Sequence, residues 1–132
     1  MLLKKILFPE ESRHFPGKRW GNIILRCLHL AGLSVYSGGL YFEMAHSKLL
    51  PWYLLTAMSG IGLMGLDTYG NGKWLLQNRG LAVLLKLLVL GLLAHTQIPK
   101  KWFVLMLIIL SGVSSHAPAN FRYYSIYHHR VI

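Results

Sequence analysis

Four histidines lie within or beside the apolar stretches of this chain: His29, His46, His95 and His116. Histidine is costly to place in hydrocarbon, so each of these residues needs a hydrogen-bond partner, a bound ligand or access to water. Imidazole groups are also common ligands of metal ions and of haem iron. The four histidines are therefore the first candidates for a functional site.

The histidines fall at two depths if each apolar stretch forms a helix that rises about 1.5 Å per residue. His29 then lies about 12 Å, and Lys86 about 9 Å, inside the same end of the helices. His116 lies about 9 Å from that side of a hydrocarbon core of about 30 Å, and Arg26 precedes His29 by roughly one turn. We expect these four residues to form one polar layer.

Two histidines at one level on antiparallel helices suit the two axial positions of a haem b iron. We therefore expect His29 and His116 to be the axial pair, with Lys86 or Arg26 close to the haem propionates. A zinc or copper site for catalysis ordinarily has three or more protein ligands at one level, whereas each level here offers two histidines. No catalytic residue is assigned.

The other two histidines are expected near the opposite surface. His95 is close to the end of its apolar stretch, and His46 follows the first stretch with Glu43 and Met44 beside it. Copper accepts imidazole and thioether ligands, so a copper site at Met44, His46 and His95 is an alternative. The simpler interpretation is that both histidines lie at a membrane interface, where headgroups or water satisfy them.

Four apolar stretches must position these side chains. Hydrophobic residues make up 54% of the 132-residue chain, and the mean hydropathy is +0.42. A membrane span needs about 20 apolar residues, with about 17 tolerated. We predict an all-α integral membrane protein, a four-transmembrane-helix bundle in one domain over residues 1–132. The predicted spans are residues 21–42, 50–66, 80–96 and 102–117.

The basic residues indicate the orientation of the spans. The net charge is +10, and lysines and arginines gather before the first span, between the second and third, and after the fourth. Because such segments stay on the cytoplasmic side, we predict that both termini are cytoplasmic and that the polar layer lies near that side. The expected location is the bacterial inner membrane. This charge placement is typical of a membrane protein, so nucleic acid is not an expected partner.

Two flanking segments complete the predicted domain. Residues 1–19 combine apolar side chains with Lys4 and Lys5, and they are expected to lie at the interface as a short amphipathic helix. Residues 118–132 form a basic, aromatic tail that is expected at the headgroup level. His128 and His129 are adjacent and do not share a helix face, so no metal site is predicted there.

One glycine motif has a dinucleotide-binding spacing. Gly60, Gly62 and Gly65 match that pattern, but the pattern has this meaning only between a strand and a helix. Here it lies inside a predicted span. Small residues let a neighbouring helix or a flat ligand approach closely, and we interpret the motif as a packing surface.

Two segments carry a family resemblance. The stretch Cys27–Gly39 looks like the opening helix of the copper-resistance D family, and Arg79–Leu87 resembles the lysine-bearing helix of that family and of HemJ-type protoporphyrinogen oxidases. The resemblance covers residues 26–95. It implies a small helical membrane protein in which His29 and Lys86 are functional, and HemJ-type proteins are associated with haem b. The end of the chain has no counterpart there, so no enzyme activity is carried over.

These observations lead to a ranked set of functions. We expect a haem b-binding membrane protein that is an electron-transfer subunit of a larger redox assembly rather than a free-standing enzyme. One alternative is an accessory subunit without a cofactor, and another is a copper-handling membrane protein. The expected partners are the lipid bilayer and other membrane-protein subunits.

Overall fold

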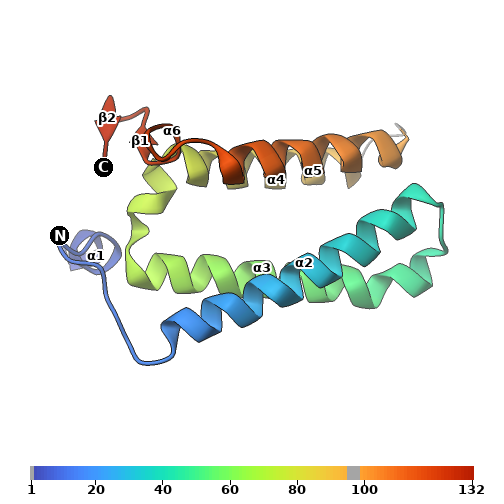
Figure 1. Ribbon diagram of the computed structural model, residues 1–132, viewed down its shortest axis with the longest axis horizontal. Coiled ribbons are helices and arrows are strands. Elements are labelled where there is room, and N and C mark those ends of the chain that lie inside the picture. Colours follow the sequence, from blue (N-terminus) through green and yellow to red (C-terminus); the bar gives the residue numbers. More distant parts are fainter. Residues whose placement is uncertain (1, 95–98) are drawn as a thin grey trace.

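The protein is mostly helical, and its long helices form two pairs that lie one over the other (Figure 1). The computed structural model describes residues 2–94 and 99–132. In chain order the elements are α1 (Leu2–Leu7), α2 (Lys18–Tyr41), α3 (His46–Gly70), the 3-10 helix η1 (Gly72–Leu76), α4 (Asn78–Ala94), α5 (Lys100–His116), α6 (Ala119–Arg122), β1 (Tyr124–Ser125) and β2 (Arg130–Val131).

Helices α2 and α3 pack closely because small residues line their contact. A Cβ atom on Gly32 would lie 2.6 Å from the Thr56 hydroxyl oxygen and 3.0 Å from the Thr56 backbone nitrogen. Gly39 is in similarly close contact with the side chain of Leu49. The two backbones can therefore approach each other only where α2 carries no side chain.

A short turn, Phe42–Ala45, joins this pair. The backbone N–H of Phe42 donates to the Gly38 carbonyl at 3.0 Å, and that of Met44 donates to Gly39 at 2.8 Å. Glu43 adopts a positive φ of 56°, the left-handed conformation that often ends a helix. The chain thus reverses direction with the last carbonyls of α2 satisfied.

The second pair consists of α4 and α5, and α5 also packs against α2. Leu107 of α5 is buried, one of three large hydrophobic side chains described as buried, with Leu49 and Trp74. Trp74 belongs to η1, which connects the two pairs. Its indole N–H donates to the Thr68 hydroxyl at 3.2 Å and so ties η1 to the end of α3.

Both ends of the chain lie at the η1 end of the molecule (Figure 1). On the N-terminal side, the backbone N–H of Arg13 donates to the Gly70 carbonyl at 2.9 Å. On the C-terminal side, the Gln77 side-chain amide donates to the Ile132 carbonyl at 2.6 Å, and that of Asn78 donates to the Phe121 carbonyl at 2.8 Å. The connection between α3 and α4 is therefore the point to which both flanking segments attach.

The tail contains the one departure from the expected all-α fold. β1 and β2 pair antiparallel, with Tyr124 opposite Val131 and Ser125 opposite Arg130. Ser125 is fully buried, its hydroxyl lies 3.0 Å from Nδ1 of His128, and it accepts the backbone N–H of that residue at 3.3 Å. These hydrogen bonds stabilise a hairpin that the aromatic and basic composition of the tail did not predict.

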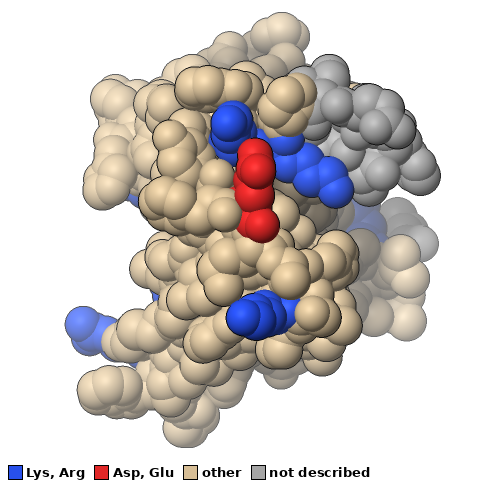
Figure 2. Space-filling model, turned by 90° about the vertical axis from the view of Figure 1, so that its right-hand side faces the viewer, with Lys and Arg blue, Asp and Glu red and all other residues tan. Residues whose placement is uncertain are grey.

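Apolar side chains cover the outside of the helices. α2 and α3 are long and apolar enough to cross a membrane, whereas α4 and α5 have 17 residues each. Many large hydrophobic side chains are exposed; Ile61 and Ile109, for example, are 64% and 66% exposed. The end of the molecule that carries the α2–α3 turn differs from the helix faces, because charged side chains of both signs are exposed there (Figure 2). Much of the described exterior of these helices is therefore apolar.

Candidate functional site

His29 of α2 is hydrogen-bonded to α3. Its Nδ1 lies 2.9 Å from the Thr56 carbonyl oxygen and 3.3 Å from the Ser59 hydroxyl. A carbonyl oxygen only accepts hydrogen bonds, so Nδ1 carries a hydrogen and donates it to Thr56. His29 is thus oriented by the neighbouring helix.

Gly60 makes room for this ring. A Cβ atom at Gly60 would lie 3.1 Å from Cε1 of His29, and one at Gly62 would lie 3.2 Å from the Leu25 side chain. Two glycines of the spaced motif therefore receive side chains of α2, and the prediction of a packing surface is confirmed for them. At Gly65 a Cβ atom would meet nothing within 4 Å.

Lys86 forms a second polar contact in the other helix pair. It is the central residue of α4, and its ammonium donates to the Ser114 hydroxyl of α5 at 3.1 Å. The Ser114 hydroxyl in turn donates to the Ser111 carbonyl at 3.1 Å. A neutral hydroxyl is the partner described for this cation, and the bond holds α4 to α5.

The predicted polar layer is thus divided between two helix pairs. His29 bonds to α3 and Lys86 bonds to α5, whereas Arg26 is exposed. His116 is the last residue of α5 and is also exposed. The contacts that the structure describes do not join His29 to His116.

The described contacts suit His29 as a single axial ligand of a haem better than they suit His29 and His116 as an axial pair. A ligating histidine ordinarily donates its second ring N–H to a carbonyl or carboxylate, as His29 does to Thr56, and this leaves Nε2 for the iron. The exposed end of α5 gives His116 no such orienting partner among the described hydrogen bonds. The described contacts therefore do not orient His116, the expected second ligand.

The histidines predicted near the opposite surface are not part of a described cluster. His46 is the first residue of α3 and is exposed, as is Met44 in the preceding turn. His95 lies outside the described residues. Within residues 2–94 and 99–132 there is no group of three or more histidine, cysteine, aspartate or glutamate side chains that could hold a metal ion.

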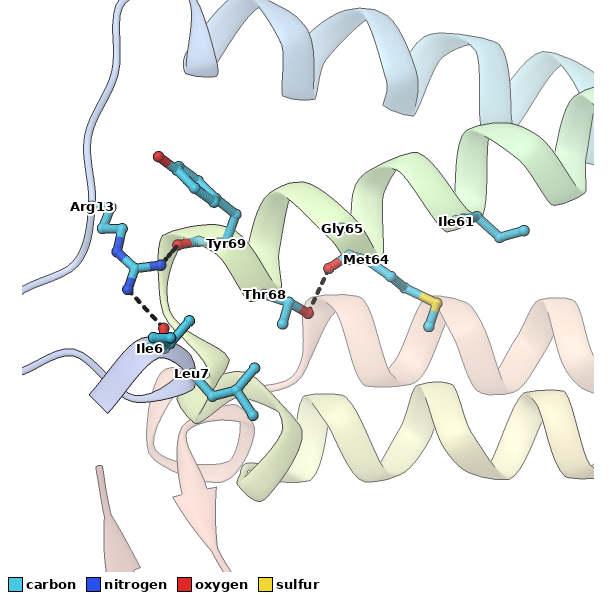
Figure 3. A pocket seen from close by; sticks show the side chains of 8 residues that line it. All are labelled: Ile6, Leu7, Arg13, Ile61, Met64, Gly65, Thr68 and Tyr69. Atoms are coloured by element: carbon cyan, nitrogen blue, oxygen red, sulfur yellow. Dashed lines mark hydrogen bonds between the residues drawn. The ribbon is translucent and has the colours of Figure 1, made fainter. Parts of the chain in front are cut away.

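A bond from His29 to the backbone or a hydroxyl of a neighbouring helix was one interpretation of the sequence, but the partner residues and the role of one arginine were not identified. The Thr56 carbonyl and the Ser59 and Ser114 hydroxyls satisfy the polar residues of the helices, and the one-turn spacings of Thr56 to Ser59 and of Ser111 to Ser114 were the available signal. Arg13 was counted only as a charge. In the structure its guanidinium bridges α1 and α3 at the edge of a cavity (Figure 3).

The described geometry offers an oriented imidazole, an interhelical lysine and an apolar cavity, but it brings no set of catalytic groups together. Comparison of the chain with known protein families, with curated proteins and with solved structures finds no match.

Proposed function

We propose that this chain is an integral membrane protein in which α2, α3, α4 and α5 cross the bilayer, and that it works as a subunit of a larger membrane assembly. One observation carries the proposal: most large apolar side chains lie outside, and only Leu49, Trp74 and Leu107 among those described are buried. Each Leu or Ile left in water forgoes about 1.5–3 kcal/mol of burial free energy. Side chains that stay exposed add nothing to the stability of a fold in water, and the few that are buried leave little to stabilise this one, so the fold needs an apolar solvent.

The arrangement of the ends supports a cytoplasmic location for both termini. Both flanking segments attach at the η1 end, and the basic residues of the sequence concentrate there, as they do on the cytoplasmic side of inner-membrane proteins. α4 and α5 would each be about 25 Å long, near the lower limit for a span. The bacterial inner membrane is the location proposed.

A role as a subunit follows from what the helices carry. Two polar residues within them, His29 and Lys86, already have partners on neighbouring helices, and the outer faces carry many exposed apolar side chains, with the exposed Arg26 of α2 as a charged exception. Such faces can bind lipid or the helices of another membrane protein. The segments outside the long helices are too short to hold a soluble catalytic unit.

Membrane extraction and cysteine labelling test this proposal. The single native cysteine, Cys27, is first replaced by alanine, and Ser47→Cys and Tyr127→Cys are then made separately, since both positions are exposed. We expect the protein to stay in the membrane pellet after alkaline carbonate treatment. An impermeant maleimide added outside intact spheroplasts should label position 47 and not position 127. Release by carbonate, or the reverse labelling pattern, contradicts the proposal.

Haem b binding is a second candidate, because one observation favours it. The Nδ1 bond of His29 to the Thr56 carbonyl leaves Nε2 free to ligate iron, and a bound haem b would supply a one-electron redox centre. Lys86 or Arg26 near the propionates and His116 as second ligand remain predictions. With copper, the alternative ligands are Met44, His46 and His95.

An absorption spectrum distinguishes these candidates. The protein is purified in mild detergent from haem-replete cells, and the pyridine haemochrome is measured for the wild type and for His29→Leu, His116→Leu and His46→Leu. If His29 is an axial ligand, its replacement removes most of the bound haem, whereas replacement of the exposed His46 leaves haem content unchanged. A wild type without a Soret band excludes the haem candidate and leaves the subunit proposal intact.

A further inference from the structure

An apolar cavity lies between α1 and α3 near the η1 end of the molecule (Figure 3). It is an open groove of about 440 Å³ rather than an enclosed pocket. Ile6 and Leu7 of α1 line one side, and Ile61 and Met64 of α3 line the other. The cavity therefore offers hydrocarbon contacts along roughly two turns of α3.

The hydroxyl group of Thr68 in this lining is already hydrogen-bonded. The Thr68 hydroxyl donates to the Met64 carbonyl at 2.7 Å and accepts the indole N–H of Trp74 at 3.2 Å. Only the methyl group of Thr68 then remains to contact a ligand. At Gly65 a side chain would enter open space, unlike at Gly60 and Gly62, where side chains of α2 fill the surface. The gap at Gly65 is thus not filled by the protein itself.

Arg13 supplies a fixed positive charge at the edge of this cavity. Its guanidinium donates to the Ile6 carbonyl at 2.7 Å and to the Tyr69 carbonyl at 3.2 Å, and it lies 5.3 Å from the centre of the Tyr69 ring. These partners hold the group in place but do not neutralise it. A guanidinium has further N–H donors, and paired donors of this kind suit a phosphate group.

We propose that this cavity binds one anionic phospholipid, with its phosphate on Arg13 and an acyl chain against Ile61 and Met64 in the space at Gly65. The proposal rests on the proposed membrane location, because that location places Arg13 at headgroup level and α3 in hydrocarbon. Charge selects the headgroup, and the open apolar groove accepts the chain. Phosphatidylglycerol carries the required single negative charge.

Two variants test the two halves of the site, each with a matched control. Arg13→Gln removes the charge, and Arg19→Gln removes an exposed arginine from the same basic segment. Gly65→Leu fills the cavity, and Gly112→Leu adds the same side chain at another helical glycine with open space around it. Binding to the delipidated full chain is measured by native mass spectrometry with phosphatidylglycerol and with phosphatidylcholine.

We expect the wild type to prefer phosphatidylglycerol. Arg13→Gln should weaken binding of that lipid by about tenfold or more, the usual effect of losing a hydrogen-bonded charge, and should remove the preference over phosphatidylcholine. Gly65→Leu should weaken binding of both lipids. The two control variants should bind as the wild type does, and circular dichroism should show equal helix content in all five proteins.

Three results overturn the inference: Gly65→Leu with wild-type binding, an equal loss in Arg19→Gln and Arg13→Gln, or displacement of phosphatidylglycerol by oleate at equal concentration. The last result would assign the site to a free fatty acid. None of them affects the membrane proposal, which carbonate extraction of the same variants tests separately.

Discussion

The atoms that a polar side chain contacts inside an apolar helix show how that helix is rotated against its neighbour. Nδ1 of His29 faces a carbonyl and a hydroxyl of α3, and the Lys86 ammonium faces a hydroxyl of α5. In hydrocarbon, a group without such partners would cost several kcal/mol, by an order-of-magnitude estimate. Each contact therefore fixes the rotation of one helix against its neighbour.

The Lys86–Ser114 contact can be measured by a double-mutant cycle. We expect Lys86→Met and Ser114→Ala to be coupled by about 0.6 kcal/mol, the average for interhelical hydrogen bonds in membranes. The unfolding free energies of both single variants and the double variant are obtained by titration with dodecyl sulfate in mixed micelles. Ser115→Ala, at an exposed position, is the control and should show no coupling with Lys86→Met.

The sequence predicts a depth for each of these residues, which stays a prediction, but it does not predict their direction. Counting residues along a span places His29 and His116 at similar depths, because each residue adds about 1.5 Å. It says little about which neighbour a side chain faces, since that depends on which helices are adjacent and how each is rotated. The ring of His29 faces α3, and the axial pair with His116 stays a prediction.

At the scale of the elements, the contact between α2 and α3 depends on residues without side chains. Gly32 meets the backbone of α3, whereas Gly38, two turns further along the same helix, would place a Cβ atom in open space. The two glycines therefore differ in what a substitution would displace.

We predict that Gly32→Leu destabilises the protein by about 1–3 kcal/mol or more, since overpacking of a close contact forces the backbones apart. Gly38→Leu should change the unfolding free energy by less than about 0.5 kcal/mol, because the new side chain enters open space. Both are measured in the same mixed micelles. Equal destabilisation by the two variants would show that the α2–α3 contact is not as close as described.

The apolar stretches predicted the positions of the long helices well and their ends less well. α3 begins at His46 and ends at Gly70, beyond the predicted residues 50–66, because polar residues such as Asp67 and Thr68 can continue a helix. Hydropathy measures side-chain polarity, whereas a helix ends where its backbone hydrogen bonds end. The tail hairpin depends on a bond between Gln77 and Ile132, which no local pattern reveals.

At the scale of the whole molecule, the two ends of the chain meet at one connection. Gln77 is buried, its amide holds the Ile132 carbonyl, and its side-chain oxygen accepts the guanidinium N–H of Arg79 at 2.6 Å. The tail is thus attached to the α3–α4 connection through the buried side chain of Gln77. Water can take over its hydrogen bond to Ile132 only if the tail moves away.

We expect Gln77→Ala to release the tail. Trypsin cleavage after Arg130, which is exposed, should become several-fold faster in detergent-solubilised protein, because cleavage requires the strand to open locally. Asn120→Ala, at an exposed position of α6, is the control and should leave the rate unchanged. Equal rates in Gln77→Ala and the wild type would mean that the hairpin holds the tail by itself.

The brevity of the Phe42–Ala45 turn has a consequence for biogenesis. In the proposed orientation, this turn is the segment between α2 and α3 that must be translocated, and it carries the single charged side chain of Glu43. The close contact at Gly32 and Gly39 can form as soon as both helices have been synthesised. The two helices can therefore enter the bilayer together as a preassembled hairpin, with little polar backbone to dehydrate on the way.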